Sequence, residues 1–138
     1  MSRPIVIDCS VTMAWCFEDE CDEYADAVLD ALAEAGGAVP SVWALEVANV
    51  LVVAERRGRL KEADSTQFVE LLRSLPIAVE ETPPDRALRS VLALAREYRL
   101  SSYDAAYLKL AMRTGAPLAS RHEGLRAACT ASGGRLFS

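Results

Sequence analysis

The sequence predicts an α/β fold in which helices cover both faces of a mainly parallel sheet. Short apolar runs rich in β-branched residues alternate with longer segments of helical spacing, and glycine or proline separates them. Strands that alternate with helices pair in parallel and need a helical layer on each face. The 138 residues are expected to form a single domain, 1–138.

Each element rests on a local signal. Strands are expected at 5–7, 38–39, 77–79, 118 and 136–137. Helices are expected at 20–35, 41–57, 61–75, 83–98, 101–114 and about 121–131. Gly36, Gly58 and Gly115 end three of these helices, and a double proline opens the one at 83.

The composition excludes several classes of protein. The net charge is −5, so a general nucleic-acid-binding surface is not expected, and a metal ion or a local basic patch would have to offset the repulsion. No apolar run reaches transmembrane length and no signal peptide is recognisable, so we expect a soluble, cytoplasmic protein with no membrane contact. No cysteine pair has C-x-x-C spacing, which argues against a zinc knuckle.

Two carboxylates stand out near strand ends and inside an apolar helix. Asp8 directly follows the first strand, where parallel sheets present functional groups, but an aspartate there serves equally well as a helix cap. Glu46 and Asn49 are the polar residues of VWALEVANVLVVA, at 42–54, and a helix so apolar on all sides is expected to be buried. A buried glutamate needs a partner or a ligand; the alternative is a side chain that reaches solvent at the helix edge.

Asp104 is a third candidate, in the stretch LSSYDAAYLKLA. Its local signals favour a structural role, because Ser101-x-x-Asp104 has the spacing of a capping box. If the three acids converge, they stay ionised together only with a cation between them. Oxygen ligands favour Mg²⁺ or Mn²⁺, the ions that serve phosphodiester hydrolysis. Spacing alone does not establish the convergence.

Four segments, in this order along the chain, resemble the PIN-domain ribonucleases, and specifically the VapC toxins of bacterial toxin–antitoxin pairs. They are IVIDCSV with Asp8 and Ser10, PSVWALEVANVL with Glu46 and Asn49, LSSYDAAYLKLA with Asp104, and GAPLASRHEGLRAA with Ser120 and His122. The resemblance implies a three-layer α/β/α PIN-like domain and a Mg²⁺- or Mn²⁺-dependent endoribonuclease. It implies that Asp8, Glu46 and Asp104 are catalytic metal ligands. Supporting roles fall to Ser10, Asn49, Ser120 and His122.

The resemblance also implies partners. RNA would be the substrate, a small antitoxin protein would block the acidic site with its tail, and a homodimer would be the building block. The charge of −5 suits a basic antitoxin segment better than it suits free RNA.

The chain departs from the family pattern at one position. The family has T-x-D after the fourth strand, and its Asp is a fourth acid; this chain has Ser120, Arg121 and His122. One possibility is that His122 belongs to the site and binds Mn²⁺ or a metal-bound water. A second is that the Glu123 carboxylate enters the site instead, although Ser120-x-x-Glu123 also has the spacing of a capping box. A third possibility is a weakened or inactive protein that binds antitoxin or RNA without cleaving. If imidazole binds the ion, metal affinity should fall at acidic pH, because the protonated ring repels a cation.

A receiver domain that accepts a phosphoryl group is a rival interpretation. Such a domain also places an acid after its first strand, but it needs an Asp after the third strand and a Lys after the fifth. Here the third strand ends in Glu80-Glu81, and no lysine follows Lys109. An active nuclease is therefore the expectation, with the non-cleaving PIN-like protein as the alternative.

Overall fold

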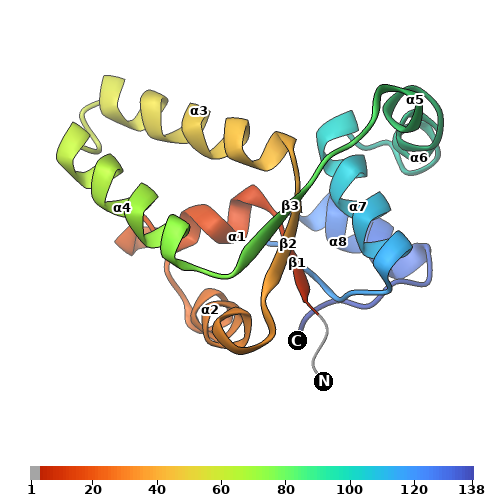
Figure 1. Cartoon of the computed structure of the whole chain (residues 1–138), viewed down its shortest axis with the longest axis horizontal. Helices are drawn as coiled ribbons and strands as arrows, with labels where there is room; N and C mark the ends of the chain where they lie inside the picture. The colour runs from red at the N-terminus through yellow and green to blue at the C-terminus, as the bar shows by residue number, and fades with distance from the viewer. Residues whose placement is uncertain (1–3) are drawn as a thin grey trace.

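A computed structural model describes residues 4–138 and has a four-stranded parallel sheet at its centre (Figure 1). The strand order is β3-β2-β1-β4, formed by β1 (Ile5–Ile7), β2 (Gly37–Pro40), β3 (Ile77–Glu80) and β4 (Leu118–Ala119). The strands predicted near 5, 38, 77 and 118 are therefore confirmed. The strand predicted at 136–137 is reduced to one parallel bridge between Leu118 and Leu136.

Helices cover both faces of this sheet and give the predicted three layers (Figure 1). One side carries α1 (Cys9–Ala14), α2 (Glu23–Ala35), α3 (Val42–Arg56) and α4 (Glu62–Ser74). The other side carries α5 (Pro84–Arg86), η2 (Ala87–Val91), α6 (Leu92–Tyr98), α7 (Ser102–Thr114) and α8 (Glu123–Ala131). The segment η2 is a π-type turn between α5 and α6, and the short 3-10 helix η1 (Glu18–Glu20) precedes α2.

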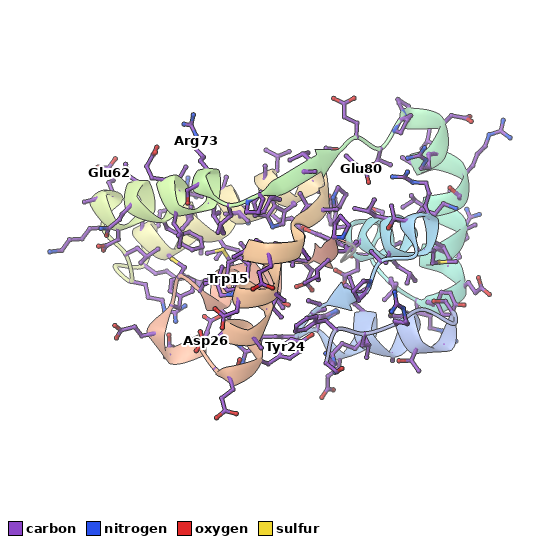
Figure 2. All side chains as sticks on the ribbon, turned by 60° about the horizontal axis from the view of Figure 1, so that its bottom comes forward. Trp15, Tyr24, Asp26, Glu62, Arg73 and Glu80 are labelled. Atoms are coloured by element: carbon purple, nitrogen blue, oxygen red, sulfur yellow. The ribbon has the colours of Figure 1, made fainter. Side chains whose placement is uncertain are left out.

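Helix α1 was not predicted, and the helix predicted from residue 20 begins only at Glu23. Four of the six residues of CSVTMA, the cysteine, serine, valine and threonine, are weak helix formers. Tertiary contacts hold it instead: Trp43 Nε1 donates to Thr12 Oγ1 (2.9 Å), and Trp15 Nε1, just after α1, donates to the Ala25 carbonyl of α2 (2.9 Å). Figure 2 labels Trp15 together with Tyr24 and Asp26, the residues on either side of Ala25. These bonds fix α1 between its neighbours, next to the end of β1.

The expectation that α3 is buried on all sides was wrong. Trp43, Val47, Leu51 and Ala54 face the core, whereas Leu45 is 74% exposed and Val52 is 37% exposed. An almost wholly apolar helix has no polar face by which the sequence could reveal its outward side.

No helix within residues 4–138 is long and apolar enough to cross a membrane.

Candidate active site

Asp8 is the buried centre of the candidate site, with a residue exposure of only 3%. It follows β1 and caps α1, because its Oδ1 accepts the Val11 N–H (3.0 Å) and the Ser10 hydroxyl (2.7 Å). Ser120 Oγ donates to the other oxygen, Oδ2. Of the roughly four acceptor positions of a carboxylate, these donors occupy three, so Oδ2 keeps one for another ligand. Asp8 therefore fills both roles that the sequence left open, strand-end acid and helix cap.

The turn after β4 is tied to Asp8 by two serine hydroxyls. Ser120 Oγ accepts the N–H of His122 (2.9 Å) while it donates to Asp8. Ser10 Oγ accepts the N–H of Arg121 (2.9 Å). The capping box predicted from Ser120 to Glu123 does not form, because α8 begins after His122 and Ser120 is engaged with Asp8.

Glu46 faces the site from the first half of α3 and is half-buried. Tyr107 of α7, whose residue exposure is 0%, donates its hydroxyl to Glu46 Oε1 (2.6 Å). Tyr107 was not among the residues predicted from the sequence. Its position three residues after Asp104, on the same face of a predicted helix, was the available signal.

Asp104 lies in the first turn of α7, where its backbone and its side chain have separate partners. Its N–H donates to Ser101 Oγ (3.0 Å), which is the cap expected from the sequence. Its Oδ2 lies 3.0 Å from Nδ1 of His122, and the Asp104 side chain is 21% exposed. The cap therefore leaves the carboxylate free to face the site, and His122 is its contact there.

The three acids act on one another electrostatically. Burial raises the pKa of Asp8 above its ordinary value, against the hydroxyl and N–H donors that lower it, and the charge of Asp104 raises it further. The pKa of Glu46 is likewise raised by burial and by the charges of Asp104 and Asp8, with the Tyr107 hydroxyl opposing. Burial, together with the charges of Glu46 and Asp8, also raises the pKa of the neighbouring Cys9 thiol, to about 12.

The remaining predicted residue lies apart from these groups. Asn49 is exposed and lines a separate hollow with Phe17 and Arg59. Glu46 takes its hydrogen bond from Tyr107 rather than from Asn49.

The carboxylates of the site fit a divalent cation, although they do not yet form a complete set of metal ligands. The charge of Asp104 raises the pKa of both Asp8 and Glu46, and Asp8 keeps a free acceptor position, so these carboxylates are hard oxygen ligands that a cation would neutralise. Within residues 4–138, no three His, Cys, Asp or Glu side chains are already close enough to hold one ion. Binding would therefore require the carboxylates to move closer together, and Glu46 can offer Oε2 while Oε1 keeps the Tyr107 hydroxyl.

Comparison with other proteins places this chain in a family. The family model for the PIN domain matches residues 5–130. The chain belongs to the PIN-domain family. Ribonuclease VapC3 of Pyrobaculum aerophilum is 31% identical over 114 residues, which cover 83% of this chain and 86% of the relative.

Two solved structures resemble the fold of this chain. The crystal structure of PAE2754 from Pyrobaculum aerophilum superposes with a TM-score of 0.70 at 26% identity, covering 91% of this chain and 79% of that one. The crystal structure of FitAcB from Neisseria gonorrhoeae superposes with a TM-score of 0.66 at 15% identity, covering 97% and 96%. The predicted three-layer PIN fold is confirmed.

The raised pKa values predict how pH affects the metal-free protein. A carboxyl group whose pKa is higher folded than unfolded stabilises the fold at pH values below the unfolded pKa, about 4. That contribution disappears as the pH rises through the folded pKa. The melting temperature with chelator should therefore fall, relative to that of Asp8→Asn, between pH 4 and 7. Added Mn²⁺ should raise it more at pH 7 than at pH 4.5; an equal gain at both pH values would contradict this prediction.

Proposed function

We propose that this protein is a metal-dependent endoribonuclease that hydrolyses RNA phosphodiester bonds, and that it is the toxin of a VapBC-type toxin–antitoxin pair. The observation that supports the proposal is that Asp8, Glu46 and Asp104, from three distant segments, lie near enough for the charge of Asp104 to raise the pKa of both other acids. All three follow or face the carboxyl edge of the sheet. Open parallel sheets bind ligands at this edge. The similarity to a protein named ribonuclease VapC3 supports the same function.

In this proposal each acid would hold Mg²⁺ or Mn²⁺ directly or through water. When bound, such a cation supplies a more acidic water and neutralises charge that develops on the phosphate. Ser10 and Ser120 hold the Asp8 carboxylate in one orientation, and Tyr107 does the same for Glu46. A support of Glu46 by Asn49 stays a prediction.

A second candidate is a PIN-domain protein that binds RNA or an antitoxin without efficient cleavage. One observation favours it: His122 stands where the family pattern has a fourth acid, and its Nδ1 lies 3.0 Å from Asp104 Oδ2. Imidazole in that position engages a proposed ligand and adds no oxygen donor. We rank the active enzyme first, because three carboxylates are enough to hold one metal ion.

The proposed partners follow from the charge of the site and from its surface. A basic antitoxin segment would be attracted to the acids. Leu45, which is 74% exposed beside Glu46, offers an apolar contact next to them. A homodimer in the cytoplasm completes the proposal. Size-exclusion chromatography with light scattering, with and without a candidate antitoxin, would test the oligomeric state.

The function itself is tested with a panel of purified tRNA and rRNA fragments. Cleavage is measured in Mg²⁺, in Mn²⁺ and with chelator, for this protein and for Glu46→Gln. Chelator-sensitive cleavage that Glu46→Gln loses would support the nuclease. A protein that leaves every RNA intact in each metal, and still binds RNA or antitoxin, would favour the second candidate.

His122→Asp is expected to change the preference between metals. Imidazole suits Mn²⁺ better than Mg²⁺, whereas a carboxylate suits both. The variant should therefore cleave about 10-fold faster in Mg²⁺ and show a lower ratio of Mn²⁺ to Mg²⁺ rates. His122→Ala is the control, because it removes the interaction with Asp104 without adding an oxygen ligand. If all three proteins show the same ratio, His122 has no part in metal choice.

A further inference from the structure

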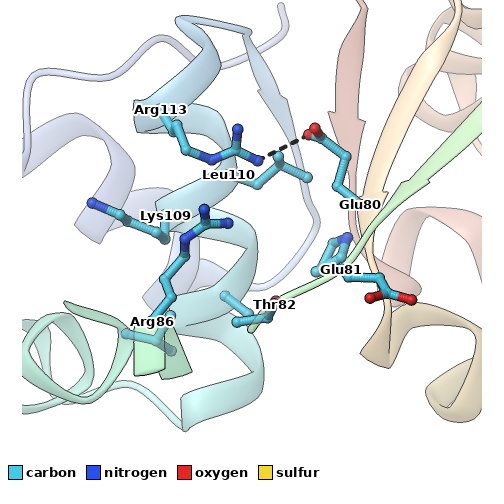
Figure 3. Close-up of a pocket in the computed structure, with 10 residues that line it drawn as sticks. Glu80, Glu81, Thr82, Arg86, Lys109, Leu110 and Arg113 are labelled. Carbon is cyan, nitrogen blue, oxygen red and sulfur yellow. Dashed lines mark hydrogen bonds and ion pairs between the residues drawn. The ribbon is translucent and has the colours of Figure 1, made fainter. Parts of the chain in front are cut away.

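A polar hollow lies beside the candidate active site and has no role in the proposed chemistry. It is bounded by the ends of β2 and β3 and by one face of α7, and Figure 3 shows its lining. Three basic side chains reach it: Arg86 from α5, and Lys109 and Arg113 from α7. Lys109 and Arg113 are four residues apart and therefore share a side of the helix.

The charges in the hollow do not all cancel. Arg113 is neutralised by Glu80, with Nη2 3.1 Å from Oε2. The carboxylate of Glu81 points away from the basic groups (Figure 3). The ion pairs formed within residues 4–138 include neither Arg86 nor Lys109.

Burial distinguishes these two cations from most other basic residues that lack an ion pair; half-buried Arg126 instead donates to the Ser120 carbonyl and the Tyr24 hydroxyl. Arg86 and Lys109 are half-buried, whereas Arg56, Arg57, Arg96 and Arg99 are exposed. A partly desolvated cation without a counter-ion costs free energy that a bound anion would recover. In a chain of net charge −5, this is a local basic patch of the kind that binding of a polyanion requires.

The hollow lies on the same edge of the sheet as the acids. Val6 pairs with Ala38 and Pro40 pairs with Glu80, so β1, β2 and β3 end at one level. Asp8 follows β1, and Glu80 ends β3, two strands away in the sheet. Two strand spacings are about 10 Å, a distance that a short stretch of a single nucleic-acid strand can bridge.

We propose that Arg86 and Lys109 bind a backbone phosphate of the RNA, beside the phosphate that lies at the acids. The RNA strand would then run along the carboxyl edge of the sheet, from β1 and β4 toward β3. A phosphate here would meet a guanidinium, an ammonium and the Thr82 side chain that also lines the hollow. This inference rests on the proposed function, because it takes RNA as the ligand.

The test measures binding of a short fluorescent single-stranded RNA over a range of salt concentrations. The measurement uses the Glu46→Gln background in Mg²⁺, so that the RNA stays intact. Arg86→Ala/Lys109→Ala should bind roughly tenfold more weakly at low salt, and its slope of log affinity against log salt should be shallower by about 0.7 for each phosphate that the protein no longer neutralises. Thermal melting of each variant verifies that it is folded, and Arg86→Gln/Lys109→Gln repeats the test with longer side chains.

Arg56→Ala/Arg57→Ala is the matched control. It removes the same charge from exposed residues at the far end of α3, about 21 Å along the helix from its start beside Pro40. An affinity unchanged in the Arg86/Lys109 variants, or an equal loss in the control, would overturn the proposal. Binding of polyglutamate, but not of RNA, that depends on the pair would also overturn it, in favour of an acidic protein ligand.

The same variants separate this proposal from the proposed function. In the Glu46 protein, loss of Arg86 and Lys109 should raise KM for RNA cleavage and change kcat little. If the protein never cleaves RNA but its RNA binding depends on the pair, the nuclease assignment fails and the phosphate site stands. If the protein binds no RNA, both fail.

Discussion

Glu46→Gln is expected to reduce RNA cleavage by more than about 100-fold while the fold is retained. The substitution removes the negative charge that a cation requires. It keeps an amide oxygen that can accept the Tyr107 hydroxyl, now 2.6 Å from Glu46 Oε1. Because the pKa of Glu46 is raised by burial and by its acidic neighbours, loss of the charge should leave the metal-free protein at least as stable.

Cleavage rates in Mg²⁺ and Mn²⁺, together with thermal melting in chelator, would measure these effects. Tyr107→Phe is the informative companion, since it keeps the carboxylate and removes only the hydroxyl that orients it. We expect a loss of about 10- to 100-fold in activity for Tyr107→Phe, partly recovered at high metal concentration. Full activity in Glu46→Gln would remove Glu46 from the site.

Two substitutions of Asp8 should have similar effects on RNA cleavage but different effects on the stability of the fold. Both Asp8→Asn and Asp8→Ala are expected to lose more than about 100-fold in cleavage, because each removes the central carboxylate. Asp8→Asn can still accept the Val11 N–H and the Ser10 hydroxyl, and it removes a charge whose burial raises its pKa. Asp8→Ala loses the cap of α1 and leaves Ser120 without its acceptor, at a cost of about 2 kcal/mol.

Urea unfolding in the presence of chelator would compare the three proteins. The expected order of stability is Asp8→Asn at or above the natural protein, and Asp8→Ala below both. Equal destabilisation by the two substitutions would show that the charge of Asp8, rather than its hydrogen bonds, supports the fold. Either variant with unimpaired cleavage would exclude Asp8 from the chemistry.

The sequence was sufficient for most of the architecture, because the signals involved are local. The apolar run at 5–7 indicates a buried strand, and the segment from Ser101 to Gly115 has a capping residue at its start and a glycine at its end, as a helix requires. Helix α1 lacked such signals, since its position depends on bonds from Trp43 and Trp15 to residues far along the chain or in another element. The outward face of α3 was hidden because Leu45 is apolar and yet exposed.

The acids of the site could be named from the sequence, but their partners could not. Tyr107 and Glu46 are 61 positions apart, and Ser120 and Asp8 are 112 apart. Such pairs depend on the order of strands in the sheet, which short-range patterns do not encode. The contact of His122 with Asp104 likewise arises only when the turn after β4 is placed beside the first turn of α7.

The order of strands also determines when this site can exist during protein synthesis. Strand β1 lies between β2 and β4, and β4 leaves the ribosome more than a hundred residues after β1. Until then β1 lacks one neighbour, Asp8 lacks the hydroxyl of Ser120, and Asp104 lacks His122. A nascent chain that has reached α7 thus carries all three acids in an unfinished arrangement. If the proposed activity holds, a ribosome making this protein is not exposed to a completed nuclease until β4 and the turn that follows it have emerged and docked.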